Sequence, residues 1–271
     1  MDAGVSSAGS ARAPDTGSKG KRIAFIVLSA VLAAAAFGAL FGVAVVIAWI
    51  DNTDGGIHRV HDMGFGSLYG AILTVGLAVQ VSHPERRISA FYQIVAVALA
   101  VVLGGVLSSS GYAALGILIL VACVILLLLH PYRSEVLRPV REGFSPLLAG
   151  LAVLGAIPLL WYASSMASLQ RNGLPADLHV KQEHWTTMAA MAIGIALVGL
   201  LSSIRFRGWR ISAWSAGTAL FLYGLASVVY PHKAGSEGTE WGLVAILGGL
   251  VFIAVAEWEA RRSSSLQEPR G

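Results

Sequence analysis

The sequence predicts an all-α integral membrane protein with eight transmembrane helices, arranged as a parallel 4+4 internal repeat with cytoplasmic N- and C-termini. Three observations lead to this prediction: an apolar composition, long apolar blocks separated by charged segments, and a stretch of sequence that recurs 123 residues later. Hydrophobic residues make up 56% of the chain and charged residues 13%, whereas soluble domains have about 25% charged residues. The chain is therefore expected to lie in lipid.

Eight apolar blocks approach or exceed the ~20 residues that a helix needs to cross ~30 Å of hydrocarbon. Backbone polar groups must find partners within the bilayer, so these blocks are expected to be helices. An outer-membrane barrel would instead show alternating segments of about 10 residues. The predicted spans cover residues 23–50, 65–82, 89–109, 112–130, 146–168, 186–204, 211–230 and 242–259.

An internal similarity relates the second and third predicted helices to the sixth and seventh. The segment from His61 to Leu99 aligns without a gap onto the segment from His184 to Leu222, and both contain the sequence Arg-Ile-Ser-Ala. Because each unit holds an even number of helices, the two copies run in the same direction, with a pseudo-two-fold axis along the membrane normal. Convergent composition of two alanine- and leucine-rich helices is the alternative that the sequence leaves open.

Charged and polar segments mark the boundaries of the two halves. The glycine-, serine- and alanine-rich start of the chain resembles a disordered tail. The basic cluster that follows it resembles a signal peptide, but its apolar run continues to Ile50, beyond the about 7–15 residues of such a peptide. We therefore expect an uncleaved first span. The expected units are a cytoplasmic tail at 1–22, a membrane half at 23–130, a cytoplasmic linker at 131–145, a second membrane half at 146–259 and a cytoplasmic tail at 260–271.

The basic residues are distributed unequally between the two sides of the predicted bundle. With both termini cytoplasmic, 15 of the 19 lysines and arginines face inward, and the other four are Arg59, Arg171, Lys181 and Lys233. Such an excess on cytoplasmic loops is typical of membrane proteins, and it attracts acidic headgroups. We expect a multi-pass protein of a bacterial-type plasma membrane whose partner is the lipid bilayer, with no nucleic-acid partner.

Histidines and carboxylates gather on the predicted outer face, whereas the spans carry almost no ionisable side chains. Five of the seven histidines fall on this face: His58, His61, His179, His184 and His232. Imidazole and carboxylate groups are ligands for zinc, iron, copper and nickel. The candidate metal ligands are His61, His184, His58, Asp62, His179 and Glu183.

The spacing of the candidates suggests how they could share a site. His58, His61 and Asp62 stand at i, i+3 and i+4, which is one helix face if the second helix extends outward by one turn. His179, Glu183 and His184 stand at i, i+4 and i+5. The first two share a helix face, and His184 is rotated from that face by about 100°. The repeat axis would bring His61 and His184 to the same depth. No spacing matches a known metal motif such as HExxH, and histidines also occur at membrane boundaries without a metal.

In outline the predicted helix arrangement resembles that of the haem A synthases, which have eight spans in two four-helix halves and histidines near the outer surface. In that family the second and fourth helices of each half supply a histidine pair. His61 and His184 match the second-helix positions. The outer starts of the fourth and eighth helices, Ser108–Tyr112 and Glu240–Trp241, carry no histidine. The resemblance therefore leaves open haem or metal ligation across the two halves.

No catalytic motif points to an enzyme. The chain lacks a GxSxG nucleophile elbow and a phosphate-binding glycine loop, and the single cysteine, Cys123, is expected to serve packing. Three functions remain. The first is a membrane protein that holds a transition metal or haem at the outer histidine and carboxylate cluster. The second is a small-solute permease with a path between the halves, and the third is a non-catalytic scaffold subunit for an unidentified small-molecule or membrane-protein partner.

Overall fold

The computed structural model describes residues 19–50, 52 and 55–265, and within this part of the chain the fold consists of helices. Its one strand-like contact is an isolated bridge between Arg141 and Phe206. Seven of the described helices are long and apolar enough to cross a membrane, and one further apolar helix has 17 residues. The predicted class, a helical multi-pass membrane protein, is confirmed at this level.

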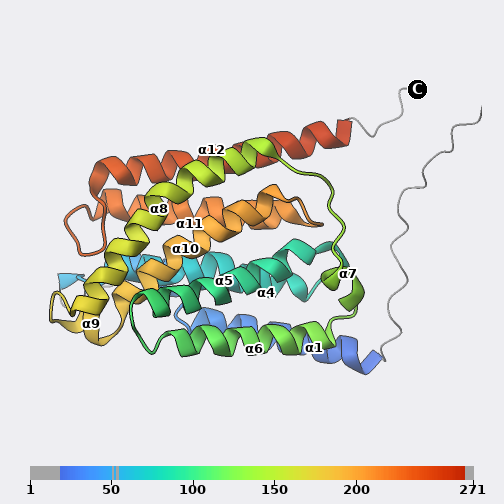
Figure 1. The fold of residues 1–271 in the computed structure, drawn as a ribbon, viewed down its shortest axis with the longest axis horizontal. Coiled ribbons are helices and arrows are strands. Elements are labelled where there is room, and N and C mark those ends of the chain that lie inside the picture. The colour runs from blue at the N-terminus through green and yellow to red at the C-terminus, as the bar shows by residue number, and fades with distance from the viewer. Residues whose placement is uncertain (1–18, 51, 53–54, 266–271) are drawn as a thin grey trace, which may run out of the picture.

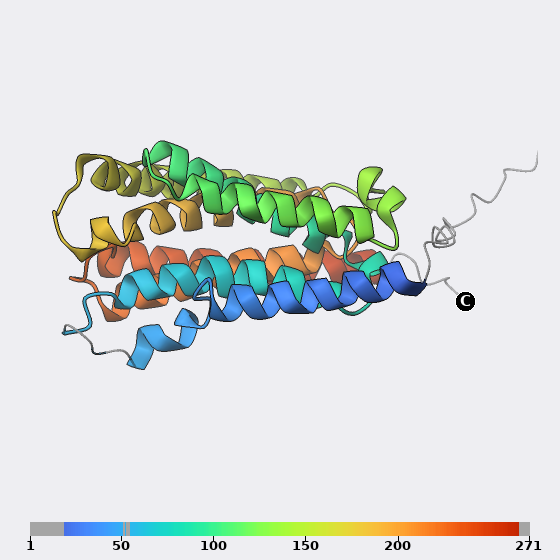
Figure 2. The same ribbon diagram turned by 90° about the horizontal axis from the view of Figure 1, so that it is seen from below.

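The long helices run side by side along the molecule (Figures 1 and 2). In chain order they are α1 (Lys19–Gly38), the continuous stretch α3 (Arg59–Phe65), η2 (Gly66–Thr74) and α4 (Val75–Gln80), then α5 (Ile88–Leu107), α6 (Ala113–Leu129), α8 (Pro146–Asn172), α10 (His184–Ser203), α11 (Trp209–Val229) and α12 (Gly238–Ser265). The short elements are α2 (Ala44–Ile50), η3 (Pro84–Arg86), α7 (Arg133–Leu137) and α9 (Leu178–Lys181). Figure 1 shows α9 at one end of the bundle and α7 at the other.

The first predicted span, residues 23–50, is not one continuous helix. α1 ends at Gly38, Phe41 adopts a left-handed backbone conformation with φ 63°, and α2 follows. The break lets two backbones approach closely, because a Cβ atom built on Gly70 would lie 2.6 Å from the carbonyl oxygen of Gly42. Apolar composition alone does not reveal such an approach, which is why the sequence predicted an unbroken span.

Helices also extend into the predicted tails and linker. α1 begins at Lys19, inside the expected tail at 1–22, and α12 continues to Ser265, inside the expected tail at 260–271. The expected linker at 131–145 contains the short helix α7. The other residues of the two predicted tails, 1–18 and 266–271, lie outside the described part of the chain.

Ion pairs join the helices at what we call the basic end, the end of the bundle that carries Arg87, Arg205, Arg207 and Arg210. Nη2 of Arg210 lies 2.6 Å from Oε2 of Glu257, and Nη1 of Arg205 lies 3.8 Å from Oε2 of Glu259. Both carboxylates belong to the last turns of α12. These contacts hold the last turns of α12 against the start of α11 and the segment that precedes it.

Two pairs of residues that the sequence similarity makes equivalent lie next to each other. The Oγ atoms of Ser89 and Ser212, which are 123 residues apart, form a hydrogen bond of 2.8 Å at the basic end. At the opposite end, which we call the histidine end, the ring centroids of His61 and His184 are 5.3 Å apart. The second and third long helices therefore meet the sixth and seventh at both ends of the bundle.

A stability prediction follows from the packing of η2 against α2. We expect Gly66→Ala to lower the free energy of unfolding by about 1–3 kcal/mol, the usual cost of overpacking. The reason is that a Cβ atom on Gly66 would lie 2.3 Å from the backbone nitrogen of Val45. Thermal unfolding in detergent measures the effect. Gly150→Ala in α8 is the matched control, because nothing lies within 4 Å of its added Cβ, and equal stability of the two variants would contradict the prediction.

Candidate metal centre

Four histidine rings meet at the histidine end, which is defined by His58, His61, His179 and His184. The ring centroids of His61 and His179 are 4.6 Å apart, and those of His58 and His184 are 4.9 Å apart. The Nδ1 atoms of His58 and His184 are 3.2 Å apart. One nitrogen from each of His58, His179 and His184 can be chosen so that all three lie within 4.8 Å of one another.

Three segments of the chain bring these rings together. His58 immediately precedes α3 and His61 lies on its first turn, so the helix begins earlier than residue 65, where the sequence placed the span. This is the outward extension that the spacing of the two histidines requires. His179 lies in the short helix α9, and His184 is the first residue of α10. Between them Glu183 has a left-handed backbone, with φ 56°, which turns the chain from α9 into α10.

Asp177 fixes the position of His179. Its carboxylate accepts hydrogen bonds from the backbone N–H of His179, at 2.9 Å, and from Nδ1 of the His179 ring, also at 2.9 Å. Burial opposes ionisation, but these hydrogen bonds lower the pKa of Asp177 below its ordinary value. An ionised Asp177 selects the tautomer of His179 that carries its proton on Nδ1. The lone pair is then on Nε2, which is buried and has no hydrogen-bond partner among the described residues.

His61 is the most enclosed of the four histidines. Its side chain is wholly buried, and neither ring nitrogen has a hydrogen-bond partner among the described residues. Trp185 packs edge-on against the ring, with centroids 4.8 Å apart. Buried polar atoms are nearly always hydrogen-bonded, and an unpaired one typically indicates an absent water, an ion or a functional role. The ring of His61 is therefore a buried polar group that the described part of the chain leaves unsatisfied.

The segment between α11 and α12 covers this interior. A Cβ atom built on Gly235 would lie 3.2 Å from Nε2 of His61, and Gly235 itself has φ 82°, a conformation that favours glycine. The hydroxyl groups of Tyr162 and Tyr223 both donate to the carbonyl oxygen of Gly235, at 2.7 and 3.0 Å. Two tyrosines from α8 and α11 thus anchor the segment above the cluster.

The two predicted carboxylate ligands lie apart from the three close nitrogens. Oε2 of Glu183 accepts a hydrogen bond of 2.7 Å from the Ser110 hydroxyl, which directs that carboxylate toward the start of α6. Asp62 is buried on α3. Among the described residues, the only group of three or more histidine, cysteine, aspartate or glutamate side chains close enough to hold one metal ion consists of histidines. The role of Asp62 and Glu183 as ligands remains a prediction.

Comparisons with protein-family models, curated proteins and solved structures find no match for this chain.

Sequence reasoning missed three contributors to the site. Asp177 precedes His179 by two residues, and an aspartate at this spacing is a common helix N-cap, so this contact had a local signal. Tyr162 and Tyr223 had none, because they approach Gly235 only through the packing of α8 and α11. Their contribution depends on tertiary structure.

The anchoring of the covering segment can be tested by hydrogen exchange. We expect Tyr162→Phe and Tyr223→Phe each to remove about 1 kcal/mol of stabilisation, the net value of one hydrogen bond, and together to speed amide exchange in the segment from Lys233 to Glu237. Mass-spectrometric exchange in detergent measures this rate. Tyr92→Phe is the control, since its hydroxyl donates to the Val136 carbonyl at the basic end. Unchanged exchange in the double variant would contradict the anchoring role.

Proposed function

We propose that this protein is a multi-pass membrane protein that binds a divalent transition-metal ion through His58, His179 and His184, with His61 as a fourth ligand. The observation that carries the proposal is the convergence of the first three, whose nitrogens lie within 4.8 Å of one another. The ring of His61 lies 4.6 Å from that of His179, centroid to centroid. Both ring nitrogens of His61 lack a hydrogen-bond partner among the described residues, so either could serve as the fourth ligand.

The distances support a single ion with imidazole ligands. Zinc–nitrogen bonds of about 2.0–2.1 Å place two ligand nitrogens at most about 4 Å apart. The three nitrogens already approach this limit, and the Nδ1 atoms of His58 and His184, at 3.2 Å, fall within it. An all-imidazole set suits zinc, copper and nickel. Magnesium and calcium are disfavoured, because they prefer oxygen ligands.

The contact between Asp177 and His179 also supports a metal site. Histidine ligands almost always donate their second ring N–H to a carboxylate, a carbonyl or a water, which fixes the ring and raises its basicity. Asp177 occupies this position at 2.9 Å from Nδ1 of His179. The other nitrogen, Nε2, is then the one available to the ion.

The packing of the rings favours an ion over a haem. Two imidazoles that ligate one haem face each other across the porphyrin plane, which needs an open slot between them. Here the rings of His58 and His184 touch, with their Nδ1 atoms 3.2 Å apart, and His61 packs against His179 and Trp185. A porphyrin would have to separate these rings, whereas an ion would join them.

We further propose that the helices form a 4+4 repeat of eight spans with α6 as the fourth, in which the second and third helices of each half pack around the pseudo-two-fold axis. The contacts of Ser89 with Ser212 and of His61 with His184 support this arrangement, since each pair is separated by the repeat length of 123 residues. Residues related by a two-fold axis touch only when they lie beside that axis. By the distribution of basic charge, the basic end faces the cytoplasm of a cell with this protein in its plasma membrane.

A second candidate function, a permease, rests on a line of buried polar contacts between the halves. Below the histidines, the hydroxyl of Ser67 donates to the Ala219 carbonyl at 3.3 Å. Further along, Nε2 of Gln93 donates to Oγ of Ser215 at 3.0 Å. A metal ion that entered from this end would meet the histidines first and then the line of polar contacts. Metal uptake by proteoliposomes, followed with an enclosed fluorescent indicator, distinguishes a permease from a protein that only binds the ion.

Metal binding by the purified protein tests the main proposal. We expect about one Zn²⁺ or Cu²⁺ per chain by elemental analysis after dialysis. His184→Ala and His179→Ala should abolish this binding, because each removes a ligand. Asp177→Asn should weaken it by about 10- to 100-fold, the usual effect of losing such an outer partner. Added Zn²⁺ should also raise thermal stability in the wild type by mass action.

The control is His83→Ala at the basic end, where the side chain is 65% exposed. This variant should bind the metal as the wild type does. The proposal fails if the wild type binds no metal above background, or if His184→Ala retains as much metal as His83→Ala.

The orientation can be tested by labelling single cysteines in intact cells. With Cys123 replaced by serine, we expect a membrane-impermeant maleimide to label Asn172→Cys at the histidine end without permeabilisation. Arg138→Cys beside α7 should react only after the membrane is opened, because the basic end is cytoplasmic. Both positions are exposed. The reverse pattern would show that the protein has the opposite orientation.

A further inference from the structure

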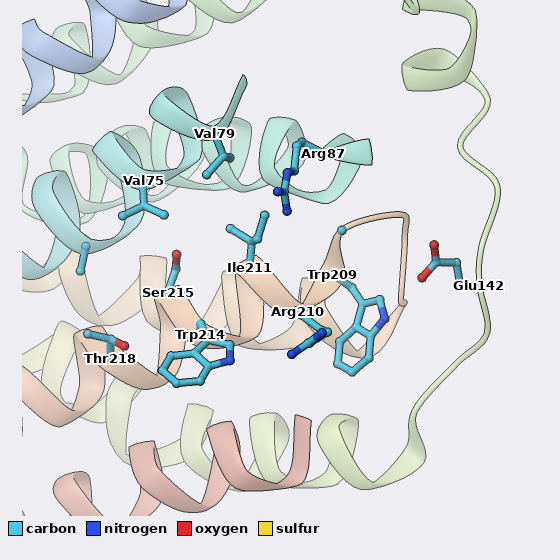
Figure 3. A pocket seen from close by; sticks show the side chains of 12 residues that line it. Val75, Val79, Arg87, Glu142, Trp209, Arg210, Ile211, Trp214, Ser215 and Thr218 are labelled. Carbon is cyan, nitrogen blue, oxygen red and sulfur yellow. The ribbon is translucent and has the colours of Figure 1, made fainter. Parts of the chain in front are cut away.

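A pocket of about 490 Å³ lies at the basic end between α4 and α11, far from the histidines (Figure 3). Its length is lined by apolar side chains of the two helices, including Val75, Val79 and Ile211. Val75 is 37% exposed and Trp214 is 48% exposed, so the pocket opens on the side of the bundle. In a membrane this opening faces lipid.

Among the described residues that line this pocket, the charged ones lie toward the basic end. Figure 3 shows Arg87 pointing from the start of α5 toward α11, and Glu142 on the segment that connects α7 with α8. Both lie just outside membrane-spanning helices, since α5 begins at Ile88 and α8 begins at Pro146. This is the depth at which phospholipid headgroups lie.

The two arginines that line the pocket differ in their partners, although the sequence similarity makes them equivalent. Arg210 forms hydrogen bonds of 3.0 and 2.6 Å with the carboxylate of Glu257, and the indole of Trp214 donates to the same carboxylate. Nε of Arg87 is buried and has no hydrogen-bond partner among the described residues. One arginine is thus neutralised within the protein and the other is directed into the pocket.

We infer that this pocket binds one phospholipid with an amine-containing headgroup. The phosphate is bound by the guanidinium of Arg87, the ammonium by the carboxylate of Glu142, and one acyl chain lies along the apolar wall of Val75, Val79 and Ile211. Arginine suits the phosphate because its planar donors match the phosphate oxygens. The opposite charges at the mouth of the pocket match a zwitterionic headgroup better than a purely anionic one.

The size and opening of the pocket fit this ligand. A volume of about 490 Å³ falls within the ~300–1,000 Å³ of small-molecule sites. It accommodates a headgroup and the upper part of one chain, while the side opening lets the rest of the lipid remain in the bilayer. A water-soluble metabolite would have no apolar group to pack against the apolar wall. An apolar ligand alone would leave Arg87 and Glu142 without a counter-charge.

Native mass spectrometry of the full-length protein tests the inference. The protein is released from nanodiscs that contain equal amounts of phosphatidylethanolamine and phosphatidylglycerol. We expect one retained phosphatidylethanolamine per chain, in at least tenfold excess over phosphatidylglycerol. Arg87→Gln should lower this retention at least tenfold. Glu142→Gln should keep a bound phospholipid but remove the preference between the two headgroups.

Two further variants separate binding from folding. Ile211→Phe narrows the apolar wall without altering Arg87, and it should also lower retention. Arg138→Gln removes an exposed arginine of the basic end outside the pocket, and its retention should equal that of the wild type. Thermal unfolding and metal content, read in every variant, show that each one is folded and that the histidine site is intact.

The inference is overturned if the wild type retains the two lipids equally, or if Arg87→Gln and Arg138→Gln retain the same amount. The lipid site and the metal site are independent, because one lies at each end of the bundle. Failure of either one leaves the other unaffected.

Discussion

The packing of the second and third long helices against the sixth and seventh is the constraint on which both sites depend. At one end of this interface Ser89 and Ser212 share a hydrogen bond of 2.8 Å, and at the other His61 and His184 lie ring to ring. Residues in the core of this interface must satisfy their polar groups without water. The polar side chains within this interface, such as Gln93 and Ser215, bond to one another, whereas the histidines gather at one end and the arginines at the other.

The convergence of four imidazoles has an electrostatic consequence. Protonated imidazoles at ring separations near 5 Å repel one another, and burial removes the water that would screen them. A metal cation replaces this repulsion with attraction, because it binds the lone pairs of neutral imidazoles that lie close together. The carboxylate of Asp177 acts in the same direction, since it holds the proton of His179 on Nδ1 and leaves the lone pair on Nε2. These contacts support the proposed cation site.

Much of the fold could be predicted from hydropathy, since the described spans lie close to the predicted ones. The break after Gly38 could not, because it depends on a contact between Gly42 and Gly70 from different helices. At the site, the sequence identified His61 and His184 as equivalent positions of the internal similarity and predicted that they lie at the same depth. It gave no sign that Gly235 would cover them. Local patterns report periodicity and charge, whereas the covering segment depends on long-range packing.

The two halves differ where the proposed functions lie. At the histidine end His61 is enclosed beneath Gly235, while its counterpart His184 touches His58. At the basic end Arg210 is paired with Glu257, while its counterpart Arg87 faces a pocket. If the two halves form the proposed repeat, symmetry is needed only for the packing at its axis. In each case a buried polar atom, a ring nitrogen of His61 or Nε of Arg87, has no hydrogen-bond partner among the described residues, and the proposed ligand would supply one.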